Sequence, residues 1–216
     1  MAGVAPIVSR AAPRLRPPGA LDEAEFLASC IKCGQCVQVC PVEAIFLADV
    51  FDGFGIGVPY IDGRAQACDF SCDAVQCVLA CPTGALSHDI DKKEQVRMGL
   101  AVLDRPDACL AMKGEGFKGL ARGADFPGTH RYVEVDRWKP IPIADHPYDL
   151  ELCDLCVREC PVKGAIELVP VTEDPNDKRR MPKVNDTCVG CGMCEMICPV
   201  DPAAIVIDTL RKGGAA

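Results

Sequence analysis

The sequence has little of what normally fills a protein core. Aromatic residues make up 5% of its 216 residues, and Trp138 is the only tryptophan. No apolar run approaches the roughly 18 to 20 residues that a membrane-spanning helix needs, since even the run that begins at Ala203 ends at Asp208. We therefore expect no transmembrane segment, and a chain that folds around something other than a large aromatic core.

Positive charge is also in short supply. Lys and Arg number 23 against 31 Asp and Glu, which gives a formal charge of −8. Such a surface would repel a phosphate backbone, so nucleic acid is not an expected partner. The first residues contain neither a continuous apolar stretch nor an adjacent arginine pair, so they do not resemble a cleavable export signal. This predicts a cytoplasmic location, with periplasmic co-export beside a signal-bearing partner as the alternative.

Catalytic motifs are scarce as well. The only histidines are His88, His130 and His146, and none has a recurring spacing to a carboxylate or a nucleophile. No glycine-rich phosphate loop or dinucleotide fingerprint follows a predicted strand. We therefore expect the histidines to lie on the surface or in the core, and the protein to be non-catalytic.

Cysteine is what the sequence has in excess, and its sixteen cysteines recur in units that end in Cys-Pro. In each unit a cysteine-bearing loop and a short helix should end at the proline, which cannot continue a hydrogen-bonded helix. Short apolar strands are expected to follow, over residues 44–47, 85–86, 165–169 and 204–207. The four units carry Cys30, Cys33, Cys36 and Cys40; Cys68, Cys72, Cys77 and Cys81; Cys153, Cys156 and Cys160; and Cys188, Cys191, Cys194 and Cys198.

The spacing within these units predicts iron–sulfur chemistry. The first and fourth units match the ferredoxin run C-x2-C-x2-C-x3-C-P, in which three thiolates hold one [4Fe-4S] cluster and the fourth holds another. The second unit has wider gaps but keeps the final x3-Cys-Pro. The third supplies three thiols, and Cys109 is the one cysteine left to complete its set. Sixteen thiols then make four groups of four, which predicts four [4Fe-4S] clusters.

Other roles for the cysteines fit less well. Structural zinc uses two separated C-x2-C pairs and needs no third cysteine followed by Cys-Pro. A disulfide framework requires an exported chain, and cysteines three residues apart on one loop seldom bridge one another. For Cys109 the alternative is a buried free thiol.

Several motifs carry a family resemblance that covers most of residues 14–207. They are the run from Leu15 to Leu21, the first unit from Cys30 to Cys36, residues 59–62 before Cys68, and residues 97–103 leading to Cys109. With these motifs the sequence resembles the NapG/MauM family of ferredoxin-type proteins, whose ligand positions match the sixteen cysteines one by one. The resemblance implies four [4Fe-4S] clusters that relay electrons between a membrane quinol-oxidising partner and a soluble oxidoreductase, often a molybdenum enzyme.

The expected fold is α+β, with two ferredoxin-like modules built from the four units. We divide the chain into an extended N-terminal arm (1–27), a first pair of units (28–108), a second pair (109–210) and a C-terminal tail (211–216). The units can pair in tandem, one with two and three with four, or nested, one with four and two with three. The run from Cys77 to Ala85 resembles iron–sulfur subunits of the dimethylsulfoxide-reductase type, which are nested, and this favours nested pairing.

Residues 110–152 stand out as an insertion relative to the family, which typically has a shorter loop here. The insertion contains a possible strand over residues 132–135, then Trp138 and the proline-rich stretch Pro140-Ile141-Pro142. It is either a docking element for a catalytic partner, with Trp138 as its anchor, or a segment that packs over the third cluster. The basic triplet from Lys178 to Arg180 is interpreted as a solvated loop, with a docking contact as the alternative.

The function expected from these features is electron transfer. The chain would relay single electrons through four [4Fe-4S] clusters, as a subunit of a hetero-oligomer. One partner would be a molybdenum or tungsten oxidoreductase, and the other a quinone-linked or soluble protein. The alternative is an iron–sulfur sensor or assembly factor, in which the clusters control the binding of a partner.

Overall fold

The structure is a computed structural model that describes residues 14–52, 55–72, 74–132, 134–136 and 139–214. It mixes short helices with small sheets, as expected of an α+β fold. Among the described residues there are five two-stranded antiparallel sheets. No helix in these ranges has the length and apolar character to cross a membrane.

Most helices are one turn long and lie where the cysteine units are. The α-helices are α1 (Glu23–Ser29), α2 (Gln35–Gln38), α3 (Gln76–Leu79), α4 (Leu110–Lys113), α5 (Leu155–Arg158) and α6 (Met193–Met196). Two 3-10 helices, η1 (Lys93–Gln95) and η2 (Ile143–Asp145), accompany them. The strands are β1 (Phe46–Leu47), β2 (Pro59–Tyr60), β3 (Leu100–Leu103), β4 (Phe117–Leu120), β5 (Thr129–His130), β6 (Ile141–Pro142), β7 (Pro147–Leu150), β8 (Ile166–Pro170), β9 (Arg180–Val184) and β10 (Ile205–Asp208).

The unit predicted from the sequence is present four times. Each of α2, α3, α5 and α6 ends two residues before a Cys-Pro pair. Apolar segments follow, since β8 and β10 lie within one residue of the predicted strands, β1 covers the second half of the first one, and Leu86 forms an isolated bridge with Ala20. The helices of the two regular units begin after Gly34 and Gly192, which adopt the left-handed conformation that glycine tolerates best.

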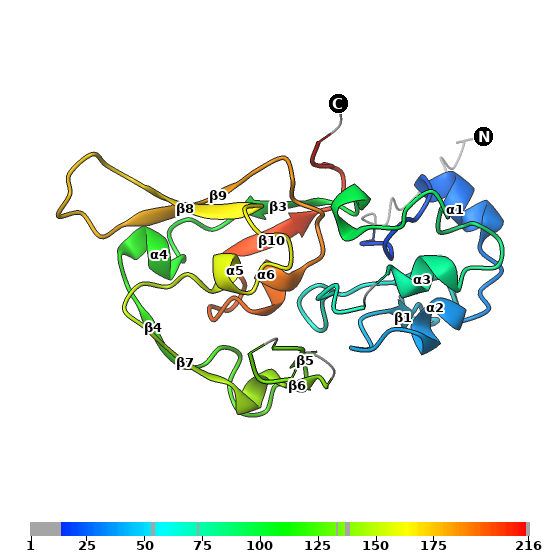
Figure 1. Ribbon diagram of the computed structural model, residues 1–216, viewed down its shortest axis with the longest axis horizontal. Coiled ribbons are helices and arrows are strands. Elements are labelled where there is room, and N and C mark those ends of the chain that lie inside the picture. The colour runs from blue at the N-terminus through cyan, green and yellow to red at the C-terminus, as the bar shows by residue number, and fades with distance from the viewer. Residues whose placement is uncertain (1–13, 53–54, 73, 133, 137–138, 215–216) are drawn as a thin grey trace, which may run out of the picture.

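Figure 1 shows the first two units, with α1, α2 and α3, at one end of the molecule, and the last two, with α5, α6, β8 and β9, toward the other. The chain crosses between these regions. Strand β3, which lies in the segment assigned to the first pair of units, pairs along its whole length with β10 of the fourth unit. Helix α1 lies where part of an extended arm was expected. Leu15, which comes before this helix in the chain, forms an isolated β-bridge with Ile61.

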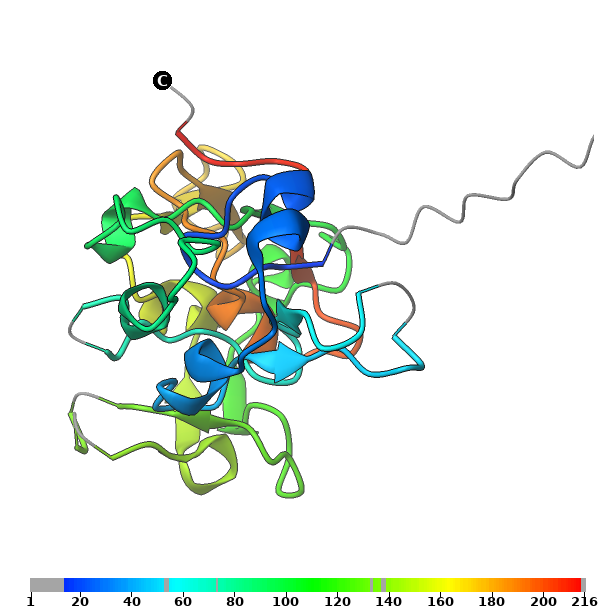
Figure 2. The same ribbon diagram turned by 90° about the vertical axis from the view of Figure 1, so that its right-hand side faces the viewer.

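The insertion folds into two small sheets of its own. β4 pairs with β7, and β5 pairs with β6, which is the proline-rich stretch. In both views these two sheets lie along the lower side of the molecule (Figures 1 and 2). The predicted strand over residues 132–135 is wrong, because Glu134 and Val135 form a turn that follows β5. Trp138 lies outside the described residues.

Small side chains let the backbone segments of the core approach one another closely. A Cβ on Gly190, whose φ is 71°, would lie 2.4 Å from the backbone of Gly99, and one on Gly192 would lie 2.8 Å from the Cα of Gly63. The glycines of the fourth unit therefore allow two other backbone segments to pack closely against it: the segment before Cys68 and the segment before β3. The interior combines these contacts with many buried cysteines and few aromatic side chains.

Candidate metal centres

Two cavities in the first half of the chain are each lined by four cysteines. One cavity is bounded by the first loop and by the last cysteine of the second unit; we call its thiols group A: Cys30, Cys33, Cys36 and Cys81. The other is bounded by the second unit and by the last cysteine of the first; its thiols are group B: Cys40, Cys68, Cys72 and Cys77. The first and second units therefore exchange their Cys-Pro cysteines.

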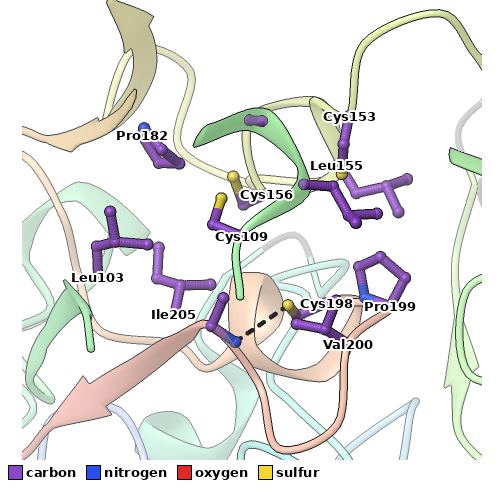
Figure 3. A pocket seen from close by; sticks show the side chains of 13 residues that line it. Leu103, Cys109, Cys153, Leu155, Cys156, Pro182, Cys198, Pro199, Val200 and Ile205 are labelled. Carbon is purple, nitrogen blue, oxygen red and sulfur yellow. Dashed lines mark hydrogen bonds between the residues drawn. The ribbon is translucent and has the colours of Figure 1, made fainter. Parts of the chain in front are cut away.

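A third cavity repeats the arrangement in the second half (Figure 3). The thiols of Cys109 and Cys156 point toward one another across it, and Cys198 reaches it from the fourth unit. Its thiols are group D: Cys109, Cys153, Cys156 and Cys198. Cys109 stands immediately before α4 and lines this cavity with the third unit, as the cysteine count predicted.

The remaining four thiols lie together in the interior. After burial, Cys160 and Cys188 are the charges that most raise the pKa of Cys191, and the same two act on Cys194. All four are buried. We call them group C: Cys160, Cys188, Cys191 and Cys194.

The grouping of the thiols follows the tandem pattern. Cys81 lies with the first unit and Cys198 with the third, whereas nested pairing would place these two the other way round. The nested pairing that the sequence favoured is therefore wrong for this geometry. The run from Cys77 to Ala85 resembles subunits with nested pairing because its local loop is similar. Which units pair depends on contacts between distant segments, and the run does not contain them.

Burial makes several of these thiols poor anions when they stand alone. Together with the charges of neighbouring cysteines, it raises the pKa of Cys36 to about 11 and that of Cys77 to about 12. Crowded, desolvated thiolates need a compensating positive charge, which the iron ions of a cluster provide. The donor set, four thiols around one apolar cavity, thus fits a [4Fe-4S] cluster. Among the described residues no three His, Cys, Asp or Glu converge on one metal ion, as zinc would require. All sixteen cysteines are free of disulfides.

Backbone amides add a repeated contact to the Cys-Pro cysteines. Ala44 donates to Cys40 Sγ at 3.3 Å, Leu86 to Cys81 Sγ at 3.4 Å, and Ala204 to Cys198 Sγ at 3.4 Å. The last contact is the dashed line in Figure 3. Amide donors to a ligating sulfur stabilise its negative charge and adjust the reduction potential of a cluster. The segment that follows three of the four Cys-Pro pairs therefore serves the site as well as the fold.

Neighbouring groups approach each other in a fixed order. Cys36 of group A acts on the pKa of Cys77 of group B. Cys191 of group C is the charge that most raises the pKa of Cys68 of group B, and the Cys68 amide donates to the Cys191 carbonyl at 3.2 Å. Cys156 of group D acts on Cys194 of group C. The groups therefore follow one another in the order A–B–C–D. Groups B and C are the inner groups of this row, and groups A and D are the outer ones.

Sequence reasoning missed a buried ion cluster beside the inner groups. His130 lies between the carboxylates of Asp69 and Glu159, at 3.5 and 3.2 Å. Burial disfavours its charged form, yet its interactions with the two carboxylates outweigh burial and raise its pKa to about 9. Asp69 and Glu159 each adjoin a ligand cysteine, which is the only signal the sequence gives. His88, in contrast, is exposed and contacts the Cys81 carbonyl at 2.8 Å.

Comparison with known proteins agrees with this chemistry. The model of the 4Fe-4S dicluster domain matches residues 29–112 and 151–201, more than half of the chain. The ferredoxin-type protein NapG of Escherichia coli is 36% identical over 206 residues, which cover 93% of this chain and 73% of NapG. The methylamine utilization ferredoxin-type protein MauM of Paracoccus denitrificans is 37% identical over 203 residues, 93% of this chain and 72% of MauM. No solved structure matches the chain.

Proposed function

We propose an electron-relay function from one premise: the chain belongs to the family of the NapG and MauM ferredoxin-type proteins. It is an iron–sulfur protein of the ferredoxin type. The observation that carries the proposal is the order of the thiol groups. In that order, the charge of a cysteine in one group raises the pKa of a cysteine in the next. A carrier that holds one redox centre in each group would have its centres in a row.

Each thiol group is assigned one [4Fe-4S] cluster, which supplies a one-electron redox couple when bound. The chain's own residues hold the ligands in place and exclude water. Cys68, Cys191 and Cys194 of the inner groups are buried, whereas Cys33 of group A is exposed and Cys153 and Cys156 of group D are half-buried. Electrons would enter at one outer group and leave at the other.

The two ends of this row suggest two partners. We assign them to a catalytic oxidoreductase subunit, of the molybdenum or tungsten class, and to a quinol-oxidising membrane subunit or a soluble carrier. The chain itself contributes no catalytic group and would work within a hetero-oligomer. Its formal charge of −8 favours partners with basic docking surfaces.

A redox titration of the anaerobically purified holoprotein tests the relay. Four one-electron centres should take up about four electrons per chain, reversibly and over repeated cycles, with constant iron content. A sensor or assembly factor would instead lose iron or change its assembly state when it is oxidised. That result would overturn the relay and favour the alternative.

A further inference from the structure

The buried ion cluster around His130 joins three separate parts of the chain. His130 ends strand β5 of the insertion, and 8% of its surface is exposed. Its Nδ1 lies 3.5 Å from Asp69 Oδ2, and its Nε2 lies 3.2 Å from Glu159 Oε2. Asp69 and Glu159 belong to the second and third cysteine units, so one imidazole spans both halves of the molecule.

The two carboxylates stand beside ligands of the inner thiol groups. Asp69 directly follows Cys68 of group B, and Glu159 directly precedes Cys160 of group C. These are the groups that meet through the hydrogen bond between Cys68 and Cys191. His130 therefore connects the backbone of one inner group to the backbone of the other, at the middle of the row.

Further contacts fix the position of the imidazole. The amide of Thr129 donates to Gln66 Oε1 at 2.8 Å, and Gln66 Nε2 donates back to the Thr129 carbonyl at 2.9 Å. The next amide along the chain, that of Arg131, donates to Asp69 Oδ2 at 3.2 Å. On the other side, the Tyr148 hydroxyl donates to Glu159 Oε1 at 3.1 Å. Both carboxylates and the strand that carries His130 are thus held by independent hydrogen bonds.

A buried ion cluster of this kind is not explained by stability alone. Replacing buried ion pairs with apolar residues of similar volume is often neutral or stabilising, because desolvation cancels much of the attraction. What an apolar replacement of His130 cannot supply is an imidazolium between the two carboxylates, and without it two unpaired negative charges would stand near centres that become more negative on reduction. Its position between the inner groups is therefore the informative feature.

We propose that His130 is a positioning residue for electron relay, which fixes the two inner groups relative to each other and places a positive charge between them. The proposal rests on the proposed function. It also assigns a role to part of the insertion: the segment around His130 braces the junction between groups B and C, whereas Leu110 and Ala111 at its start line the cavity of group D. The cysteine ligands of groups B and C stay the same under this proposal, because His130 is not itself a ligand.

The test uses anaerobically purified holoprotein with three substitutions. His130→Gln keeps a hydrogen-bonding side chain without the charge, and His130→Lys restores the charge. His146→Gln is the matched control, because His146 lies in the same insertion, stacks on Tyr132 at 3.8 Å between ring centroids, and faces Glu134 rather than Asp69 or Glu159. Iron content, EPR-monitored redox titration and the spin–spin splitting of reduced clusters are measured for each.

With full iron content, His130→Gln should lower the midpoint potentials of two clusters and alter their mutual spin–spin splitting. His130→Lys should return the potentials toward wild type, and His146→Gln should change neither. Unchanged potentials and splitting in His130→Gln would overturn the proposal. Loss of iron from both His130 variants would also overturn it, in favour of a purely structural role. A wild type that does not cycle electrons would instead refute the relay itself.

Discussion

At the scale of single residues, the last cysteine of each unit has a different task from the thiols before it. Cys81 follows α3 of the second unit but lines the cavity of the first, and Cys198 follows α6 but lines the cavity of the third. A helix of one turn places its final cysteine on the side away from the preceding loop, so two adjacent units must exchange ligands. The exchange ties the two units together.

This exchange predicts which cysteine substitutions overlap. Cys36→Ala and Cys81→Ala remove thiols from the same group, so the double variant should lose no more iron than the more damaging single variant. Cys77→Ala with Cys81→Ala affects two groups, although both cysteines lie in one unit, and its iron losses should add. Iron analysis of the anaerobically purified proteins checks this. Additive losses for the pair Cys36 and Cys81 would contradict the grouping.

A second prediction concerns the pH dependence of His130. Its pKa is about 9 in the fold against 6.5 for an ordinary histidine. A raised pKa stabilises the folded state fully below the unfolded value, and this contribution disappears as the pH rises through the folded value. The stability difference between wild type and His130→Gln should therefore be constant below about pH 6.5 and shrink as the pH approaches 9.

The measurement is the denaturant midpoint for loss of cluster absorbance in the holoprotein at each pH. The holoprotein is required because free thiols of the apoprotein titrate in the same range. His146→Gln serves as the control for the loss of an imidazole from the same insertion. A difference for His130→Gln that grows with pH would show that the imidazole is neutral in the fold.

At the scale of elements, the contact between the fourth unit and the strand before it depends on two glycines. Gly190, with φ of 71°, lies against the backbone of Gly99, which leads into β3. The Met98 amide donates to the Val189 carbonyl at 3.0 Å in the same contact. A methyl group at position 190 would push this segment away from the loop that carries Cys188 and Cys191.

Gly190→Ala should therefore destabilise the protein strongly. The left-handed conformation alone costs a residue with a side chain on the order of 1–3 kcal/mol, and the steric overlap adds to that. Gly123→Ala is the control, because Gly123 has a φ of 82° but no atom within 4 Å of the added Cβ. The denaturant midpoint and iron content should fall much further for Gly190→Ala. Equal effects in both variants would mean that the backbone contact contributes nothing.

The sequence predicted the elements that depend on local rules. Proline after each last cysteine ends the helices, and the apolar runs that follow become β8 and β10 or, in part, β1. Pairing partners depend on distant segments, so the pairing of β3 with β10 was not predicted. The alternation of residues 132–135 suggested a strand, but the preceding β5 already ends at His130, which the ion cluster with Asp69 and Glu159 holds. For the site, the four unit patterns and the exchange of the last cysteine were readable from the sequence, whereas the choice of which units exchange required the packing.

At the scale of the whole molecule, the end that carries group A is unusually apolar. Ile31 lies between two ligand cysteines of that group and is 63% exposed, and Leu79 of α3 is 61% exposed. The basic triplet lies at the other end, across the start of β9, where Arg179 pairs with Asp177 at 2.8 Å. Exposed apolar side chains beside a redox site are typical of a docking surface. We expect a partner to dock over group A.

Ile31→Glu should slow electron exchange with that partner by about tenfold, as expected when an apolar contact at the centre of an interface is lost. Its iron content should match wild type, because the side chain is exposed. Val171→Glu, in the loop after β8 and 37% exposed, is the control and should leave the rate unchanged. Stopped-flow mixing with the co-purified oxidoreductase measures the rate. Equal slowing by both substitutions would point to net charge rather than to docking at group A.

The central claim is that the sixteen cysteines form four cluster sites in a row. Iron and acid-labile sulfide per chain, measured with low-temperature EPR of the dithionite-reduced, anaerobically purified protein, test it most directly. We predict about sixteen iron and sixteen sulfide per chain, four of each for every group of four thiolates, with spectra that show interacting reduced clusters. About eight of each, with the signals of isolated clusters, would contradict the claim and leave half of the thiols without a cluster.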